Sequence, residues 1–224
     1  MSDTVEFQLV EFADNPEPRC ACVLLLDTSG SMDGPPIAEL NDGLQTLQSS
    51  LMVDSVASLR VELSIITFGG SVMSRQEFAN PDHVDLPILS ASGNTPMGQA
   101  LNLALDRLEE RKRIYKAHGI AYYQPWLFLI TDGAPTDGAH LWRQARNRIA
   151  ELESRKALSI FPIGVEAADM RKLAELSTKR EPLRLRGLNF QDMFIWLSQS
   201  LSQVSRSNPT DEVPLQSPRG WGAV

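Results

Sequence analysis

The chain has 224 residues, of which 42% are hydrophobic and 22% charged, and these proportions indicate a folded protein with one large domain rather than two small ones. Its net charge of −7 argues against nucleic-acid phosphate as a partner. The first residues lack the basic and apolar regions of a signal peptide, and no apolar run approaches the ~20 residues of a membrane-spanning helix. We therefore expect neither a secretion signal nor a membrane anchor.

Strand and helix patterns alternate through most of the chain, between an acidic lead-in (1–19) and a Ser/Pro/Gly-rich tail (205–224) that is expected to be disordered. This gives one domain over residues 20–204. Strands are expected over residues 21–26, 61–68, 71–78, 126–131, 158–164 and 182–186, and helices over residues 37–51, 96–113, 141–152, 169–177 and 189–204.

The alternation predicts an α/β fold of the Rossmann-like, doubly wound class, with a mostly parallel sheet and helices on both faces. The run 71–78 follows a Gly-Gly turn and is expected to be one antiparallel edge strand. Cys20 and Cys22 are separated by one residue, so a disulfide between them would be strained. We expect two reduced thiols, which fits the cytoplasm.

Oxygen-bearing side chains follow the first strand directly. Asp27, Ser29 and Ser31 come after an unbroken apolar run, which is typical of a strand buried on both faces. Ligands bind at the carboxyl ends of strands in open α/β sheets. Carboxylate and hydroxyl oxygens suit a hard cation such as Mg2+ and suit Zn2+ or copper poorly.

Two later strand and helix boundaries carry residues of the same kind. Thr95 lies at the entry to the second helix, and Asp132 follows the buried strand 126–131 within Thr-Asp-Gly. In a doubly wound sheet both residues reach the same edge as Asp27. A serine-rich loop alone is also typical of helix caps and turns, but matches at three separate boundaries favour a metal site.

Together these residues resemble the metal-ion-dependent adhesion site of the von Willebrand factor A domain family. The resemblance covers roughly residues 20–204, and Asp27, Ser29, Ser31, Thr95 and Asp132 match the five signature positions in order. Within the family the chain is similar to the small bacterial stand-alone group typified by the tellurium-resistance TerY proteins.

The resemblance implies that the hydroxyls contact the metal, while the two aspartates act directly or through water. It also implies Mg2+, with Mn2+ or Ca2+ tolerated, and an open position for an Asp or Glu carboxylate of a partner protein. For the TerY group it implies a stress-resistance or conflict system, with a kinase or phosphatase among the partners. Neither nucleic acid nor a membrane is expected as a partner.

The alternative is a metal-assisted enzyme, or an enzyme subunit, that acts on phosphate or nucleotide substrates. The sequence has no Gly-x-x-x-x-Gly-Lys-Ser/Thr loop and no Gly-x-Ser-x-Gly elbow. None of the three histidines lies at a strand end beside a nucleophile. We therefore expect a non-enzymatic binding module. A scaffold in which a metal only stabilises the fold is a third interpretation.

Overall fold

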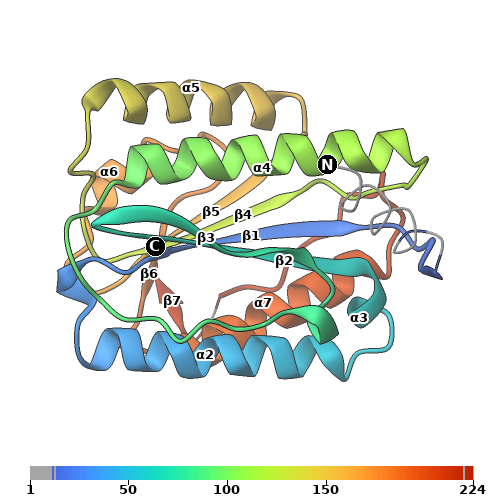
Figure 1. Cartoon of the computed structure of the whole chain (residues 1–224), viewed down its shortest axis with the longest axis horizontal. Coiled ribbons are helices and arrows are strands. Elements are labelled where there is room, and N and C mark those ends of the chain that lie inside the picture. The colour runs from blue at the N-terminus through green and yellow to red at the C-terminus, as the bar shows by residue number, and fades with distance from the viewer. Residues whose placement is uncertain (1–11, 13, 219, 224) are drawn as a thin grey trace.

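A seven-stranded sheet lies between two layers of helices in the computed structural model, which describes residues 12, 14–218 and 220–223 (Figure 1). The strands are β1 (Cys20–Asp27), β2 (Val61–Gly69), β3 (Ser71–Ala79), β4 (Trp126–Thr131), β5 (Ser159–Gly164), β6 (Leu183–Leu185) and β7 (Gly222–Ala223). The helices are α2 (Pro35–Met52), α3 (Ala57–Arg60), α4 (Met97–Ala117), α5 (Ala139–Ser154), α6 (Met170–Ala174) and α7 (Phe190–Ser205), with short 3-10 turns η1 (Gly30–Met32) and η2 (Pro81–His83).

The strand order is β3-β2-β1-β4-β5-β6-β7, and every neighbouring pair is parallel except at the two edges. β3 pairs antiparallel with β2, as its sequence predicted. β7 pairs antiparallel with β6 at the other edge, which the sequence did not predict. The expected fold class, a mostly parallel doubly wound sheet, is confirmed.

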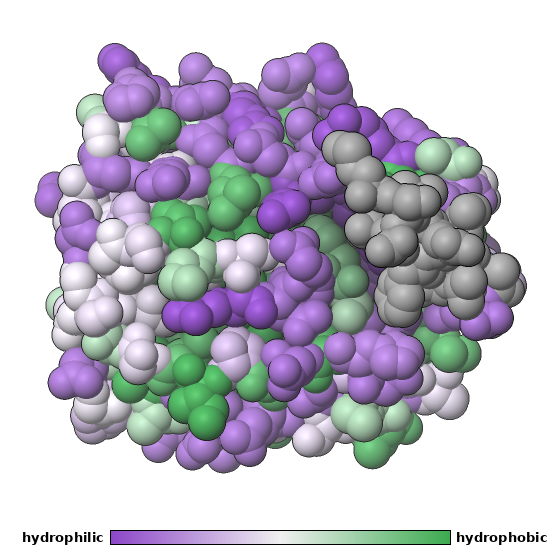
Figure 2. All heavy atoms as spheres, viewed as in Figure 1, coloured by the Kyte–Doolittle hydropathy of each residue, from purple (hydrophilic) through white to green (hydrophobic). Residues whose placement is uncertain are grey.

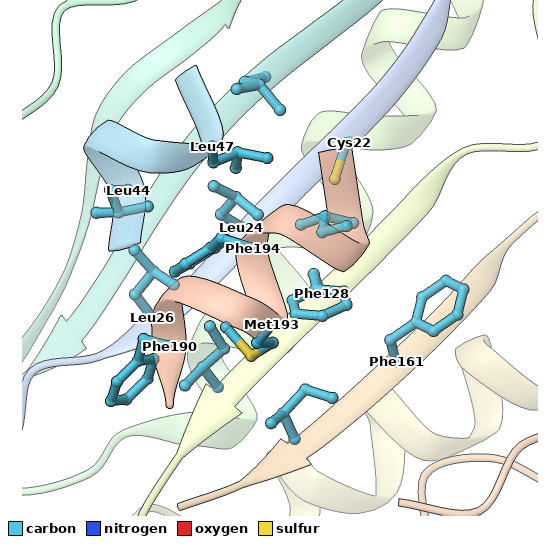
Figure 3. Packing of buried hydrophobic residues seen from close by; sticks show 14 of the residues in the cluster. Cys22, Leu24, Leu26, Leu44, Leu47, Phe128, Phe161, Phe190, Met193 and Phe194 are labelled. Atoms are coloured by element: carbon cyan, nitrogen blue, oxygen red, sulfur yellow. The ribbon is translucent and has the colours of Figure 1, made fainter. Parts of the chain in front are cut away.

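β1 is apolar without alternation because helices cover both of its faces. Leu24 and Leu26 point toward α2 and α7, whereas Val23 and Leu25 point toward α4 and α5. Figure 3 shows the first of these packing layers, in which β1 and β4 meet α2 and α7 through Leu24, Leu26, Leu44, Leu47, Phe128, Phe190, Met193 and Phe194. Burial on both faces therefore fixes the direction in which β1 delivers the residues that follow it.

Cys20 and Cys22 are buried and free, as the sequence predicted. Burial, together with the charge of Glu62, raises the pKa of the Cys20 thiol to about 12. Both thiols belong to the packing of β1 against α2 and α7.

Arg19, the last residue of the lead-in, belongs to a buried charge network. Arg19 and Glu62 have no exposed surface, and the Arg19 Nε donates to Glu62 Oε1 at 2.9 Å. Arg111 donates to the same carboxylate at 2.7 and 2.8 Å, and the Tyr115 hydroxyl donates to it as well. Phe12 lies over both guanidinium groups. Burying charged groups is costly unless hydrogen bonds satisfy their polar atoms, and here three side chains donate to one carboxylate.

The expectation of disorder for residues 205–224 was wrong for the residues that the structure describes there. Trp221 is 2% exposed and precedes β7, and its ring lies beside that of Trp196 with centroids 5.3 Å apart and planes tilted by 56°. The Trp196 indole donates to the carbonyl of Gln216 at 2.9 Å. Low apolar content suggested disorder, but one large aromatic side chain buries enough surface to anchor a short segment.

Apolar residues on the face shown in Figure 2 form several small patches separated by hydrophilic side chains. Among the described residues, none of the helices has both the length and the apolar character required to cross a membrane.

We predict that Trp221→Ala lowers the free energy of unfolding by about 3 kcal/mol, because it leaves a cavity beside Trp196. Urea denaturation of the purified chain measures the change. Ile88→Ala is the matched control, since Ile88 is 94% exposed and its truncation should cost less than about 0.5 kcal/mol. Equal effects of the two substitutions would contradict the packing of the tail.

Candidate metal centre

The turn after β1 directs Asp27 and the two serines toward one point. Asp27 has no exposed surface, and its Oδ1 accepts a hydrogen bond from the Ser29 backbone N–H at 2.8 Å. This local bond is the turn that aspartate favours. The η1 turn then reverses the chain, so that the hydroxyl oxygens of Ser29 and Ser31 lie 3.2 Å apart.

Asp132 reaches the same place because β4 is the parallel neighbour of β1. The register pairs Leu26 with Ile130, so the two strands end side by side. The Ser31 hydroxyl donates to Asp132 Oδ1 at 2.8 Å. Ser31 and Asp132 are 101 positions apart in the chain, and their convergence was predicted from their places at the ends of neighbouring strands.

Thr95 completes the group from the start of α4. It is 6% exposed, and its backbone N–H and C=O both bond to Thr136, at 3.0 Å each. A Cβ built on Gly133 would lie 3.5 Å from Thr95 Oγ1 and 3.9 Å from Asp27 Oδ2. The structure therefore brings all five predicted site residues together, and their role as metal ligands stays a prediction.

Two threonines that the sequence analysis left out position this group. The Thr131 hydroxyl donates to Asp27 Oδ2 at 2.5 Å and accepts from the Gly133 N–H at 3.2 Å. Thr136 fixes the backbone of Thr95, as described above. The position of Thr131 beside Asp132 in Thr-Asp-Gly was the available signal, whereas Thr136 lies in a loop with no pattern to single it out.

The loops around the centre approach one another so closely that one position requires glycine. The Gly30 N–H donates to the Gly93 carbonyl at 2.9 Å, and the Ser92 N–H donates to the Thr28 carbonyl at 2.8 Å. Gly93 has a φ of +73°, and a Cβ there would lie 2.5 Å from the Gly70 Cα. The loop that leads to Thr95 is thus locked against the end of β1.

The charges at the centre lack a compensating cation among the residues that the structure describes. Burial raises the pKa of Asp27, the hydrogen bonds from Thr131 and Ser29 oppose this, and the charge of Asp132 raises it further. Neither aspartate takes part in an ion pair within the described ranges. Two carboxylates and three hydroxyls in one small space fit a hard divalent cation.

Neighbouring residues have structural roles. The Asp137 carboxylate accepts from the backbone N–H groups of Gly98 and Gln99, at 3.2 and 2.7 Å, and so caps α4. Met32 and Met97 are fully buried, so neither side chain offers surface to a partner.

The fold and this cluster define an α/β domain with a candidate cation site at the carboxyl edge of its sheet. The family model of the von Willebrand factor type A domain matches residues 22–193, so the chain belongs to that family. Domains of this family commonly bind a divalent metal and use that site to bind proteins. No curated protein matches the chain.

Solved structures with the same fold include pilus and byssus proteins. The pilus adhesin SpaC of Lactobacillus rhamnosus GG matches with a TM-score of 0.66 and 12% identity, over 84% of this chain and 30% of the adhesin. The vWF domain of the pili tip protein Mfa5 of Porphyromonas gingivalis matches with a TM-score of 0.62 and 10% identity, over 88% and 99%.

Proximal thread matrix protein 1 of the mussel byssus, with a zinc-occupied MIDAS motif, matches with a TM-score of 0.55 and 16% identity, over 83% of this chain and 48% of the mussel protein. The chain thus spans less than half of the adhesin and of the mussel protein. At these identities the likeness shows the fold alone.

We predict that Gly93→Ala destabilises the domain by more than about 2 kcal/mol, because a side chain there adds a backbone clash to the strain of a positive φ. Gly119→Ala is the matched control, since Gly119 has a φ of +69° with nothing near its Cβ position. Urea denaturation of both variants separates the clash from the strain, and equal losses would contradict the close loop packing.

We also predict that the free energies of unfolding of wild type and Asp27→Asn, both measured in chelator, differ by an amount that depends on pH. The pKa of Asp27 is raised in the folded state, so its contribution to stability is greatest at low pH. That contribution is lost as pH rises through the folded pKa. The free energy of unfolding of wild type should therefore fall relative to Asp27→Asn as pH increases from the ordinary value of 3.8 through the raised pKa of Asp27. A difference that does not change with pH would contradict the raised pKa.

Proposed function

We propose that this chain is a non-enzymatic protein-binding module that depends on a divalent cation. In this proposal the hydroxyls of Ser29, Ser31 and Thr95 bind the cation, and Asp27 and Asp132 bind it directly or through water. When bound, the cation supplies a Lewis-acidic position for a carboxylate oxygen of a partner protein. The side chains of the chain itself orient the ligands and keep water out of the buried side of the centre.

The observation that carries the proposal is the pair of buried carboxylates without a protein cation beside them. Two negative charges in a desolvated place are costly unless a counter-charge is supplied. The hard oxygen set favours Mg2+, with Mn2+ or Ca2+ as substitutes. Zinc in the mussel protein makes Zn2+ a cation to test beside them.

The finer assignment extends the resemblance to TerY proteins. We place the module in a bacterial stress-resistance or conflict system, in the cytoplasm, with a kinase or phosphatase among its partners. The free thiols of Cys20 and Cys22 support the reducing compartment.

The assignment as a binding module rather than an enzyme rests on the neighbours of the centre. Asp137, the nearby carboxylate in sequence, accepts backbone N–H groups of α4 on both oxygens, and this capping holds it at the start of that helix. A general base must reach the proton it removes. Metal-dependent hydrolysis of a phosphoester, lost in Asp132→Ala, would overturn this part of the proposal.

We predict that Mg2+ at a concentration of 100 Kd stabilises wild type by about 2.7 kcal/mol, which is a rise in Tm of roughly 5–10 °C for a chain of this size. Ser29→Ala/Ser31→Ala should lose this shift, because two of the three hydroxyl ligands are gone. Differential scanning fluorimetry with Mg2+, Mn2+, Ca2+ and Zn2+ measures it.

Ser49→Ala/Ser55→Ala is the matched control, since both serines are exposed and lie outside the centre. This variant should keep the full shift. Affinity capture from the native lysate then tests the partner: a protein held by wild type in Mg2+ should be released by chelator and by Ser29→Ala/Ser31→Ala. A partner retained in all these conditions would contradict binding through the cation.

A further inference from the structure

A second hollow lies at the end of the sheet opposite to the metal centre. This groove has a volume of about 1230 Å3 and is lined by the loops that lead into β4 and β5 and by the last turns of α4 and α5. Figure 1 shows α4 and α5 side by side on one face of the sheet. Asp27 ends β1 and Asp132 follows β4, so both lie at the carboxyl ends of the strands. The length of the strands therefore separates the metal centre from the groove.

Six cationic side chains line the groove, although the whole chain has a net charge of −7. They are Lys112, Lys116, Arg155, Lys156, Lys179 and Arg180. The body of the domain contributes one lining carboxylate, Glu153, which accepts hydrogen bonds from Ser177. The groove is therefore a local basic surface on an acidic protein, and it attracts anionic ligands.

Four of these cations, Lys112, Lys116, Lys179 and Arg180, form no salt bridge with any residue that the structure describes. Cations near the C-terminus of a helix interact favourably with the helix dipole, and this accounts in part for the positions of Lys112 and Lys116 near the end of α4. It does not explain Lys179 and Arg180, which lie in the loop between α6 and β6. The Arg180 guanidinium lies over the Phe161 ring, 4.5 Å from its centroid, and the charge of Glu153 acts on it. Two separate segments thus bring positive charge to one hollow.

The tail forms one wall of the groove and shows which ligand fits it. Residues 209–215 line the groove, and within them Glu212 forms an ion pair with Lys156. This part of the tail carries Asp211 and Glu212 and forms neither helix nor strand, so an acidic stretch of chain already lies against one of the six cations. The chain itself provides the model for an acidic peptide in this place.

The size and the mixed lining favour a peptide over a small anion. Small-molecule sites usually measure ~300–1,000 Å3, and this groove is larger. Tyr122 and Leu215, both half-buried, lie among the cations and offer apolar contacts to the side chains of a peptide. A lone phosphate or nucleotide would use only a part of this lining.

We propose that the groove binds an extended, acidic segment of a partner protein. The bound segment contacts Lys112, Lys116 and Lys179, which form no salt bridge with a described residue, and it competes with Glu212 for Lys156. This binding is independent of the metal centre, and it provides a second contact with the same partner or a contact with a different one.

Fluorescence anisotropy with fluorescein-labelled octaglutamate as the probe tests the proposal. All titrations contain chelator, so that the carboxylates of the probe cannot report on the metal centre. We expect saturable binding that weakens as salt increases. Lys116→Glu/Lys179→Glu should weaken it about tenfold, because each reversal replaces an attraction with a repulsion.

Arg143→Glu/Arg171→Glu is the matched control. Both arginines are exposed and outside the groove, and the substitution changes the net charge by the same amount. Binding should stay within about twofold of wild type. Equal losses in the two double variants, or no saturable binding, would overturn the proposal. Circular dichroism of each variant shows that it is folded.

Two further measurements separate the remaining possibilities. Glu212→Gln should strengthen binding about twofold or more, because it frees Lys156, and a weaker affinity would contradict competition by the tail. Single-stranded DNA or inorganic polyphosphate that displaces the probe far better than unlabelled octaglutamate would overturn the assignment to a protein segment. Ser29→Ala/Ser31→Ala should bind the probe as wild type does, so that failure of one site is distinguishable from failure of the other.

Discussion

The hydrogen bond from the Thr131 hydroxyl to Asp27 joins the ends of two neighbouring parallel strands, and the candidate metal centre depends on it. β1 and β4 are buried on both faces, so their register leaves no freedom in where they end. The turn after each strand therefore delivers its aspartate to the same point. Ser31 then bridges the two turns through its bond to Asp132.

The buried carboxylates at the two ends of the sheet differ in their partners. Glu62, at the start of β2, meets two guanidinium groups and a tyrosine hydroxyl. Asp27 and Asp132 meet only hydroxyl and backbone donors among the described residues. The guanidinium groups beside Glu62 balance its charge and favour stability. The described residues supply no such group beside Asp27 and Asp132, and this leaves room for a cation. Such local cost is typical of functional sites.

The two ends of the sheet also divide the binding surface by charge. The carboxyl edge presents aspartates and hydroxyls, and the opposite end presents the cations of the groove. A partner that offers a carboxylate to the metal and an acidic segment to the groove would contact both ends of one domain. The tail contributes to the groove, because Trp221 packs near the end of the tail and Glu212 lies in the wall of the groove.

Local patterns in the sequence determined the alternation of strands and helices, the buried nature of β1 and the aspartates and hydroxyls at strand ends. These features follow from apolar periodicity and from residues adjacent in the chain. Only the tertiary structure decided the roles of Thr131 and Thr136, the burial of Trp221, and the gathering of Lys116 and Lys179 into one groove. Each of these depends on contacts between segments far apart in the chain, and no local pattern records which partner a side chain will meet when the helices pack on the sheet.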